Sequence, residues 1–516
     1  MIGCRRLFGA PTWLVVILAI AGSMAAVYVA LALWVRRAAR RQNEAGIPTR
    51  GRGLLIGSFF GRRLFRKAWL RARMAVATRR RKQELAAKAG IRSAEEAVAL
   101  LGSMKGVFMK VGQIVSFAHD ALPEQAKGML QGLQKDAPPM AFELVRRVIE
   151  EELGADLGAH FKNLEETPLA AASIGQVHRA RLVDGADVVV KVQYPGVDTA
   201  IEADLVALER MGKVIAPFSP AFDAESVLAE LRARIQDELD YRLEARSQAL
   251  FCRLWEGHPL IRVPRVFPRH TTRRVLTSEH VRGFGYYDFL READDGDKRT
   301  ASATIHDFVF DSMFCHLVYN GDPHPGNYLF HEDGAVTFID FGCVKRFTRE
   351  SMDNIKTFFR AIIEGDRATH DRYVPILGLV RPGRDWDHDN MWNHWRYHLE
   401  PYISGDFEFT PDYLARGREV MAPRNTKDMN LPADLLFFTR ITFGLNAIAQ
   451  QLGSRGNFHK SARRHFYPDE DGVSALGLAG VELPDRFRRL PHLHPAGSLV
   501  AAVESEGTLP SWDAAT

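Results

Sequence analysis

Two short stretches of the sequence carry polar side chains in an arrangement that suits phosphoryl transfer. The first is Asn-Gly-Asp-Pro-His-Pro-Gly-Asn at residues 320–327, and the second is Asp-Phe-Gly at residues 340–342. Phosphoryl transfer requires a carboxylate near the nucleophile and oxygen ligands for Mg²⁺. Asp322 suits the first task, and Asn327 and Asp340 suit the second. Each stretch alone is a weak signal, but the pair at this spacing predicts a kinase-like site.

A β-hairpin must bring these two stretches together. Apolar runs at residues 328–330 and 335–339 flank the turn sequence Glu-Asp-Gly at 332–334, which predicts two strands with one polar stretch at each end. His324 lies between two prolines and could be considered as a metal ligand. No second His or Cys lies at ligand spacing, which favours a loop-stabilising hydrogen bond instead.

A lysine-bearing strand follows a small-residue loop earlier in the chain. Residues 169–182 are predicted to form a strand, a tight loop and a second strand, and residues 188–192 a third strand that contains Lys191. A lysine within an apolar strand is costly unless it is paired. We therefore interpret Lys191 as a phosphate-binding lysine rather than an edge-strand residue. Gly175 alone stands where a glycine-rich loop would be expected.

The partner of Lys191 should be an acid on a following helix. Apolar residues recur at every fourth position from residue 227 to residue 243, which predicts one long helix. Glu244 is the candidate partner, and a solvated acidic helix face is the alternative. On an ideal helix Asp240 shares a face with Glu244, whereas Glu238 points away from both.

Two further segments carry candidate site residues, one before the Lys191 strand and one after the Glu244 helix. Residues 93–115 begin with a capping box and continue with apolar residues at helical spacing, which predicts a helix with Lys110 and Gln113 on one face. Periodicity alone makes Lys110 an ordinary solvated lysine. Residues 275–283 predict a strand and a glycine-terminated linker in the place of a kinase hinge, which makes Glu279 a nucleotide-binding candidate.

Composition limits the class of protein. The 516 residues, 46% of them hydrophobic, can bury one large core or two. Residues 1–82 carry 18 Lys/Arg and one acidic residue, which gives this segment a net charge of +17. Since the whole chain carries +5, residues 83–516 carry a net charge of −12. A local basic segment on an acidic body excludes a nucleic-acid binder. The four scattered cysteines indicate a reducing compartment without a zinc site or disulfide framework.

The N-terminal region is predicted to bind a membrane. Residues 7–35 contain no charge in 29 positions, enough for a span of ~20 residues; a cleaved signal peptide is the alternative. Four arginines within residues 36–41 outnumber the two before the run, which predicts that the body lies in the cytoplasm. The expected membrane is a bacterial inner membrane. Residues 36–82 then alternate basic and apolar pairs, which favours an amphipathic helix on anionic lipid over a disordered linker.

In their order along the chain, these motifs resemble those of the UbiB/ADCK family of atypical kinase-like proteins, also called the ABC-one family. The resemblance covers roughly residues 95–455. It rests on Lys-x-Gly-Gln at 110–113, the alanine-rich loop at 170–177, Val-Val-Lys-Val-Gln-Tyr-Pro-Gly at 189–196, Glu-x-Asp at 238–240 and the two stretches at 320–327 and 340–342.

The resemblance implies an α+β, two-lobed protein-kinase-like fold with a family-specific N-terminal helical extension, here preceded by a single transmembrane helix. The expected parts are an anchor at residues 1–35, a basic juxtamembrane segment at 36–92, the helical extension at 93–164, an N-lobe at 165–281, a C-lobe at 282–455 and a partly disordered tail at 456–516. No chemistry is assigned to the tail.

The resemblance also implies ATP or ADP and Mg²⁺ as cofactors. Asp322 would take the catalytic position, Lys191 and Glu244 would form the phosphate-binding pair, and Asn327 and Asp340 would hold Mg²⁺. The nucleotide-binding residues would be Ala170, Ala171, Ala172, Ser173, Gly175, Val177, Lys191 and Glu279, and in the family an alanine loop is associated with altered nucleotide selectivity. The residues expected to regulate the cleft are Lys110, Gln113, Glu238 and Asp240.

The function implied by the family is nucleotide hydrolysis or phosphoryl transfer in support of isoprenoid-quinone (ubiquinone-type) biosynthesis or lipid homeostasis. The expected partners are nucleotide, anionic membrane lipids and proteins of the quinone pathway, without nucleic acid. The alternatives are a small-molecule or lipid kinase and a nucleotide-gated scaffold. Because no Ala-Pro-Glu-like segment follows Asp340, a platform for a protein substrate is not visible.

Overall fold

The computed structural model describes residues 140–206, 232, 236–488 and 500, apart from residues 173, 200, 203–204, 381–382, 384, 404, 422–428, 431 and 468–471. The predicted anchor, the juxtamembrane segment, Lys110, Gln113 and Ser173 lie outside the described residues. The chain divides into two compact units. One includes residues 195–235, where Val197, Ile201 and Leu205 are buried at every fourth position. The other includes residues 138–194 and 236–516 and carries the candidate site.

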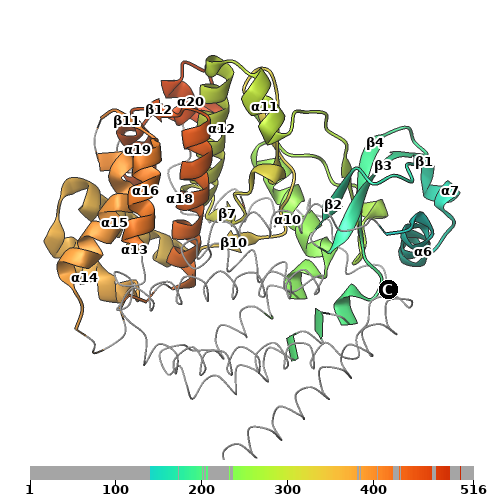
Figure 1. Cartoon of the computed structure of the whole chain (residues 1–516), viewed down its shortest axis with the longest axis horizontal. Helices are drawn as coiled ribbons and strands as arrows, with labels where there is room; N and C mark the ends of the chain where they lie inside the picture. Colours follow the sequence, from blue (N-terminus) through green and yellow to red (C-terminus); the bar gives the residue numbers. More distant parts are fainter. Residues whose placement is uncertain are drawn as a thin grey trace, which may run out of the picture. The chain divides into compact units, whose positions relative to one another are not determined.

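The N-lobe is a five-stranded antiparallel sheet. Its strands are β1 (Phe161–Leu164), β2 (Ala170–Ala172), β3 (Gly175–Leu182), β4 (Asp187–Gln193) and β6 (Val275–Glu279), in the order β1-β3-β4-β6 with β2 paired to β3. The valines of β4 alternate so that Val188, Val190 and Val192 are fully buried. They pack against helix α6 (Phe142–Leu153), which is followed by α7 (Leu157–His160) (Figure 1).

The N-lobe core extends further toward the N-terminus than residue 165. Helix α6 buries Val145, Val148 and Ile149 in the same hydrophobic cluster as the valines of β4, and β1 pairs with β3. Both elements lie in the range that the sequence assigned to the helical extension. The apolar spacing of α6 predicts a helix, but it does not say which sheet the apolar face will cover.

The long helix predicted through residues 227–243 is interrupted. Residues 236–238 are helical, but Asp240 is extended, with φ −120° and ψ 94°, and begins α10 (Tyr241–Leu254) as its N-cap. Its carboxylate accepts a hydrogen bond of 3.0 Å from the backbone N–H of Arg242, which satisfies one of the free amides of the first turn. The prediction of one continuous helix is wrong because the apolar spacing runs across this cap.

The C-lobe combines short strands with helices. Its described elements are β5 (Ile261–Arg262), α11 (Tyr286–Glu292), α12 (Asp295–Phe314), β7 (Val318–Asn320), η3 (Pro325–Asn327), β8 (Tyr328–Phe330), β9 (Val336–Phe338), β10 (Val344–Arg346), α13 (Arg349–Glu364), α14 (Arg367–Ile376), α15 (His388–Ile403), β11 (Phe407–Glu408), α16 (Pro411–Val420), α18 (Ala433–Gln451), β12 (Arg455–Gly456), α19 (Phe458–Phe466), α20 (Ala475–Leu478) and α21 (Asp485–Arg488). The short helix η2 (Pro268–His270) packs instead against β6 of the N-lobe sheet.

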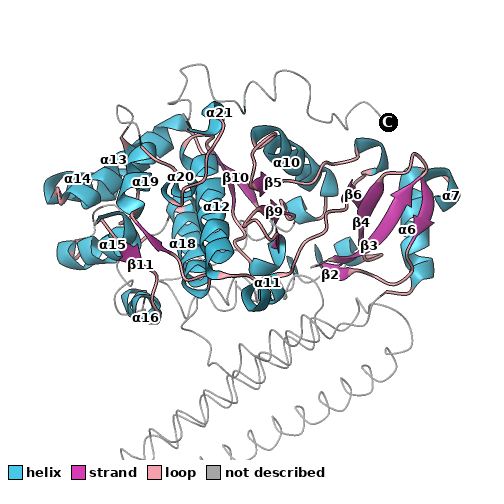
Figure 2. Ribbon diagram, turned by 90° about the horizontal axis from the view of Figure 1, so that it is seen from above, coloured by secondary structure: helices cyan, strands magenta, loops and turns pink. Residues whose placement is uncertain are grey.

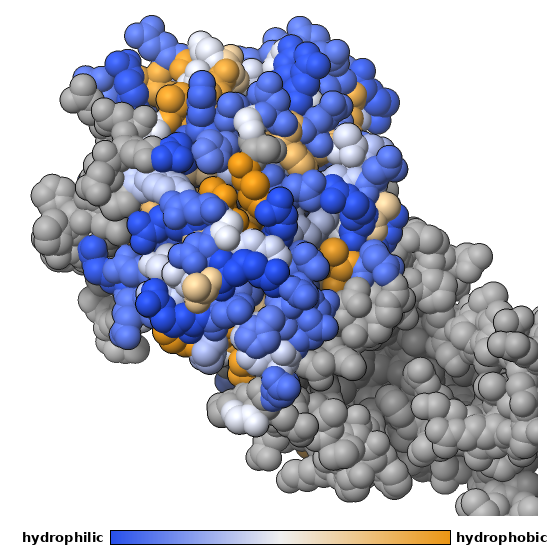
Figure 3. Space-filling view, turned by 90° about the vertical axis from the view of Figure 1, so that its left-hand side faces the viewer, coloured by the Kyte–Doolittle hydropathy of each residue, from blue (hydrophilic) through white to orange (hydrophobic). Residues whose placement is uncertain are grey.

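Helix α12 forms the centre of the C-lobe. From Ala301 to Phe314 every side chain except that of His306 is buried, as expected of a helix that other elements cover on all sides. Helices α12 and α18 lie side by side in both ribbon views (Figure 2). The surface on the α14 side of Figure 1 is mostly hydrophilic, with small separate hydrophobic patches (Figure 3). Among the described helices, none is both long and apolar enough to cross a bilayer.

The interpretation of residues 456–516 as an appendage is wrong for the described part of that range. Helix α19 buries Phe458, Ala462 and Phe466 in the main C-lobe core, and Phe487 of α21 joins the same cluster. The high content of Arg, Pro and His suggested a solvated tail. Several of these polar side chains instead satisfy buried groups of α12, as described below.

We expect the stability of the fold to decrease in mild acid. Burial lowers the pKa of His258, His316 and His394 from about 6.5 to about 4. Below pH 6.5 the unfolded chain therefore binds protons that the folded chain does not. Each such histidine should cost about 1.4 kcal/mol of unfolding free energy per pH unit between pH 6.5 and pH 4.

Urea unfolding at pH 6.5, 5.5 and 4.5 measures this loss. His394→Gln removes one of the buried titrating groups and should reduce the slope of unfolding free energy against pH by about 1.4 kcal/mol per unit. Asn393→Gln, at the exposed neighbouring position on α15, serves as the control, and it should leave the slope unchanged because it removes no titrating group. Equal slopes in the wild type and in His394→Gln would contradict the expected effect.

Candidate functional site

The centre of the site is an ion pair between strand β4 and helix α10. The Lys191 Nζ lies 2.8 Å from Glu244 Oε1 and 2.9 Å from Glu244 Oε2. Lys191 comes from the apolar strand β4, and Glu244 lies in the first turn of α10, just after the Asp240 cap. The pairing predicted from the sequence is present in the structure, and the interruption of the long helix leaves it intact.

A third charged group joins this pair. The Asp340 Oδ2 lies 3.8 Å from Lys191 Nζ, and its side chain is 35% exposed. Burial alone would lower the pKa of Lys191, but the carboxylates of Glu244 and Asp340 outweigh burial and raise it. Burial raises the pKa of Glu244, and the Lys191 charge opposes this only in part. One ammonium thus faces two carboxylates, an arrangement that favours a further cation beside Asp340.

The predicted hairpin positions the two polar stretches. β8 pairs antiparallel with β9, with Tyr328 opposite Phe338, and Gly334 in the turn has the left-handed φ of 70° that favours glycine. The backbone N–H of Ile339 donates to Asn327 O over 3.0 Å. This contact brings Asp340, the next residue in the chain after Ile339, close to Asn327.

The loop that carries Asp322 is held by its own side chains. Asn327 Nδ2 lies 3.1 Å from both the backbone O and the Oδ2 of Asp322. His324 Nδ1 accepts a hydrogen bond of 3.0 Å from the Gly326 backbone N–H, so the loop-stabilising role predicted for His324 is confirmed. The Asn320 Nδ2 donates to the Asp340 backbone O over 2.7 Å and ties this loop to the second stretch.

The backbone around Asp340 is also fixed. The Gly342 N–H donates to Asp340 Oδ1 over 3.0 Å, which orients the carboxylate. A methyl group on Gly342 would lie 3.6 Å from Glu244 Oε2, which shows how closely the Asp-Phe-Gly segment approaches α10. Phe341 is buried and lies 5.0 Å, between ring centroids, from Phe251 of the same helix.

The alanine loop lies in register with Lys191. Across the sheet, Ala170 is opposite Val177, Val177 is opposite Lys191, and Lys191 is opposite Leu276. Because residues directly opposite one another point to the same face, Ala170 and Val177 share the sheet face of Lys191. Ala171 and Ala172 complete the short strand, and Ala172 is opposite Gly175.

Gly175 is required by a close backbone contact. A Cβ at this position would lie 2.1 Å from the Val192 backbone O. Gly175→Ala should therefore distort the β3–β4 pairing and lower the free energy of unfolding by about 1–3 kcal/mol, the usual range for overpacking. A urea titration measures it, with Gly158→Ala in α7 as the control, because nothing lies within 4 Å of that Cβ. Equal stability of the two variants would show that the β3–β4 pairing accommodates the added methyl group without strain.

The other predicted site residues have local partners in the structure. The Glu279 carboxylate accepts from the Arg265 backbone N–H over 3.2 Å at the end of β6. The Asp240 carboxylate binds the Arg242 guanidinium at 2.7 Å as well as its backbone N–H. Glu238 is half-buried two residues before the cap. The nucleotide and regulatory roles of these three residues stay predictions.

Sequence reasoning missed several residues around the site. Tyr241 is buried beneath Lys191, with the ammonium 5.1 Å from its ring centroid. Its position three residues before Glu244 on one helix was a usable signal. Leu169 and Ile339 are 50% and 37% exposed although both are large and apolar. They adjoin the alanine loop and Asp340 in sequence, where single exposed apolar side chains are an ordinary surface feature.

The fold and this arrangement define the class of protein. A strand lysine paired with a helix glutamate, an Asp/Asn loop and an Asp-Phe-Gly segment within a two-lobed α+β fold make this a kinase-like protein. A family model described as the ABC1 atypical kinase-like domain matches residues 132–374. An uncharacterized protein of Mycobacterium tuberculosis is 31% identical over 340 residues, which cover 64% of this chain and 68% of that protein. The chain belongs to the ABC1 atypical kinase-like family.

Other relatives agree with this assignment. The mitochondrial atypical kinase COQ8 of Saccharomyces cerevisiae is 32% identical over 249 residues, 48% of this chain and 50% of COQ8. The match to an uncharacterized Synechocystis protein is 32% over 289 residues, 55% of this chain and 49% of that protein, so the chain spans about half the length of these two relatives. Among solved structures, Rv3197 of Mycobacterium tuberculosis in complex with erythromycin is 31% identical with a TM-score of 0.56, covering 75% of this chain and 98% of that one.

Proposed function

We propose that this chain binds ATP or ADP with Mg²⁺ beside Lys191 and acts as an atypical kinase or ATPase. The observation that carries the proposal is the convergence of Lys191, Glu244 and Asp340. A lysine held by one carboxylate and facing a second is the arrangement that phosphoryl-transfer enzymes use. Lys191 would bind the α- and β-phosphates, and Glu244 would hold it in place.

The donors around Asp340 suit Mg²⁺. Asp340 and Asn327 offer oxygen atoms, which this hard cation prefers, and the excess of carboxylate over ammonium charge favours a cation there. When bound, Mg²⁺ would neutralise charge on the phosphates. Asp322, held by Asn327, would orient the attacking hydroxyl or water. Val177, which lies on the same sheet face as Lys191, would contact the nucleotide base.

A small or lipid-like acceptor suits the lobe better than a protein substrate. After Asp340, β10 leads directly to α13, which begins at Arg349. This leaves little chain for a substrate platform. The proposal also includes membrane attachment by one N-terminal helix, with the body in the cytoplasm on anionic lipid. It further includes a role in isoprenoid-quinone or lipid metabolism, which the likeness to COQ8 supports.

Product analysis of the purified full chain in detergent tests this function. The chain is incubated with γ-labelled ATP, Mg²⁺ and vesicles that contain anionic lipid and an isoprenoid quinone precursor. Free labelled phosphate indicates an ATPase, and label in the lipid fraction indicates a lipid kinase. Both should be lost in Asp322→Asn. Nucleotide binding without either product would favour the nucleotide-gated scaffold instead.

A further inference from the structure

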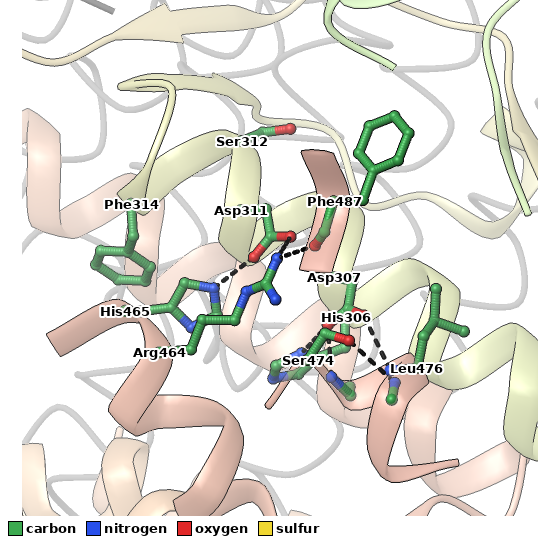
Figure 4. Close-up of polar contacts among 12 residues, drawn as sticks. His306, Asp307, Asp311, Ser312, Phe314, Arg464, His465, Ser474, Leu476 and Phe487 are labelled. Atoms are coloured by element: carbon green, nitrogen blue, oxygen red, sulfur yellow. Dashed lines mark hydrogen bonds and ion pairs between the residues drawn. The ribbon is translucent and has the colours of Figure 1, made fainter. Parts of the chain in front are cut away.

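The described C-terminal segment (residues 458–467 and 472–488) is bound to α12 through buried ionic contacts. Asp311 of α12 accepts hydrogen bonds from the Arg464 guanidinium, at 3.1 Å, and from His465 Nε2, at 2.6 Å (Figure 4). All three side chains are at most 4% exposed. Because removing one partner of a buried ion pair leaves an uncompensated charge, this contact holds α19 firmly against α12.

A second carboxylate on the same helix binds the next part of the segment. Asp307, one turn before Asp311, accepts hydrogen bonds of 2.8 and 2.9 Å from the backbone N–H groups of Ala475 and Leu476. These are the first amides of α20, and Ser474 caps the same helix. The two aspartates share one face of α12 and fix two successive elements of the C-terminal segment.

Arg464 also determines where the end of the segment lies. Its guanidinium donates to the backbone O of Phe487 over 2.6 Å and to that of Arg488 over 2.9 Å. Figure 4 shows the guanidinium between Asp311 and the Phe487 carbonyl. The buried ionic contact on α12 therefore also positions the ring of Phe487.

Phe487 packs against the end of α10. Its ring is stacked on Trp255, with centroids 5.9 Å apart and planes at 10°, and it meets His258 edge-on at 4.5 Å. Trp255 is the C-cap of α10, and its Nε1 donates to Ser312 of α12 over 3.3 Å. The first turn of the same helix carries Glu244. Because a helix of 14 residues is a rigid rod of ~21 Å, a displacement at Trp255 is transmitted to Glu244.

The cluster around Asp311 is better explained as this contact than as a metal site. Ligand atoms of Asp311, Cys315 and His465 lie within 4.8 Å of one another. The Arg464 guanidinium already supplies the positive charge beside Asp311, and a bound cation would have to displace the His465 hydrogen bond.

We propose that the C-terminal segment positions the phosphate-binding pair: Phe487, held by Arg464 against Trp255, keeps α10 in the orientation that presents Glu244 to Lys191. Phe487 and Arg464 are positioning residues that contact neither nucleotide nor Lys191. The consequence for nucleotide affinity rests on the proposed function, whereas the effect on α10 itself does not.

The test compares Phe487→Ala with Phe466→Ala in the full chain. Phe466 is a buried phenylalanine of the same segment, but its ring meets Phe314 and Phe359 of the C-lobe rather than α10. Hydrogen exchange is followed in peptides covering Tyr241–Leu254 without nucleotide, and the affinity for Mg-ADP is measured separately. Phe487→Ala should accelerate exchange in α10 and weaken Mg-ADP binding by roughly three- to tenfold, the range one aromatic pair can transmit.

Phe466→Ala should lower the melting temperature but leave hydrogen exchange in α10 and the affinity for Mg-ADP unchanged. Phe487→Tyr, which keeps the stacked ring, should show wild-type exchange and affinity. Unchanged exchange in Phe487→Ala, or equal acceleration in Phe466→Ala, would overturn the proposal. If the wild type does not bind Mg-ADP, the proposed function fails, and the exchange readout still decides the positioning role. Should Phe487→Ala not fold, Phe487→Leu and Phe466→Leu replace the two alanine variants.

Discussion

Replacement of Asp340 by asparagine is expected to abolish Mg²⁺-dependent nucleotide binding. The amide keeps the Oδ1 that accepts from the Gly342 N–H, so the local backbone should persist. It loses the negative charge that a divalent cation requires. We expect the affinity for Mg-ADP to fall by more than about 100-fold, because even groups that only support a metal ligand cost 10–100-fold when they are removed.

Isothermal titration with ADP, with and without Mg²⁺, measures this effect. Asp333→Asn is the matched control, since it is the same chemical change in the turn at the other end of the β8–β9 hairpin, where the carboxylate caps Ala335 N–H and contacts Arg262. The control should bind Mg-ADP like the wild type. Mg²⁺-dependent binding that persists in Asp340→Asn would contradict the assignment of Asp340 as a metal ligand.

Removal of Glu244 should destabilise the fold and weaken nucleotide binding together. Lys191 would remain largely buried, with Asp340 at 3.8 Å as its charged partner in the site. Loss of one member of a buried ion pair typically costs about 3–5 kcal/mol. We expect Glu244→Ala to lie near the lower end of that range, because the partly exposed Asp340 can move toward the ammonium.

A urea titration followed by tryptophan fluorescence gives the change in unfolding free energy. The control is Glu150→Ala in α6, which breaks the i, i+4 pair between Arg146, 57% exposed, and Glu150, 30% exposed, and should cost about 0.5 kcal/mol. Similar losses in the two variants would mean that the Lys191–Glu244 pair contributes no more than a surface ion pair.

The local parts of the site could be predicted because neighbouring residues determine them. The β8–β9 hairpin follows from two apolar runs around an Asp-Gly turn, and Lys191 was identified because an apolar strand makes an unpaired lysine costly. Glu244 was identified because such a lysine needs an acidic partner on a following helix. These inferences need only the period of strands and helices and the chemistry of a few side chains.

Features that depend on contacts between distant segments could not be predicted. The break at Asp240 occurs because a cap competes with helix continuation, and periodicity does not reveal which one prevails. The role of the C-terminal segment depends on Asp307 and Asp311, which are more than 150 residues away from their partners. In the sequence Arg464 and His465 are only two of many polar residues in an Arg- and His-rich stretch.

Together these contacts restrain the helix that carries Glu244. Helix α10 is held near Glu244 by Lys191, at Phe251 by Phe341 of the Asp-Phe-Gly segment, and at Trp255 by Phe487. Three separate segments thus restrain one helix. A site whose charged groups are already in place loses less free energy in ordering them when a ligand binds.

The most direct test of the central claim is the Mg²⁺ dependence of ADP binding by the full-length wild-type chain, measured by isothermal titration in detergent. We predict saturable binding of one ADP per chain that strengthens at least about tenfold when Mg²⁺ is present, since the carboxylates beside Lys191 repel the phosphates until a cation offsets them. Binding of equal strength with and without Mg²⁺, or no binding at all, would contradict the assignment of Lys191, Asn327 and Asp340 to a Mg-nucleotide site.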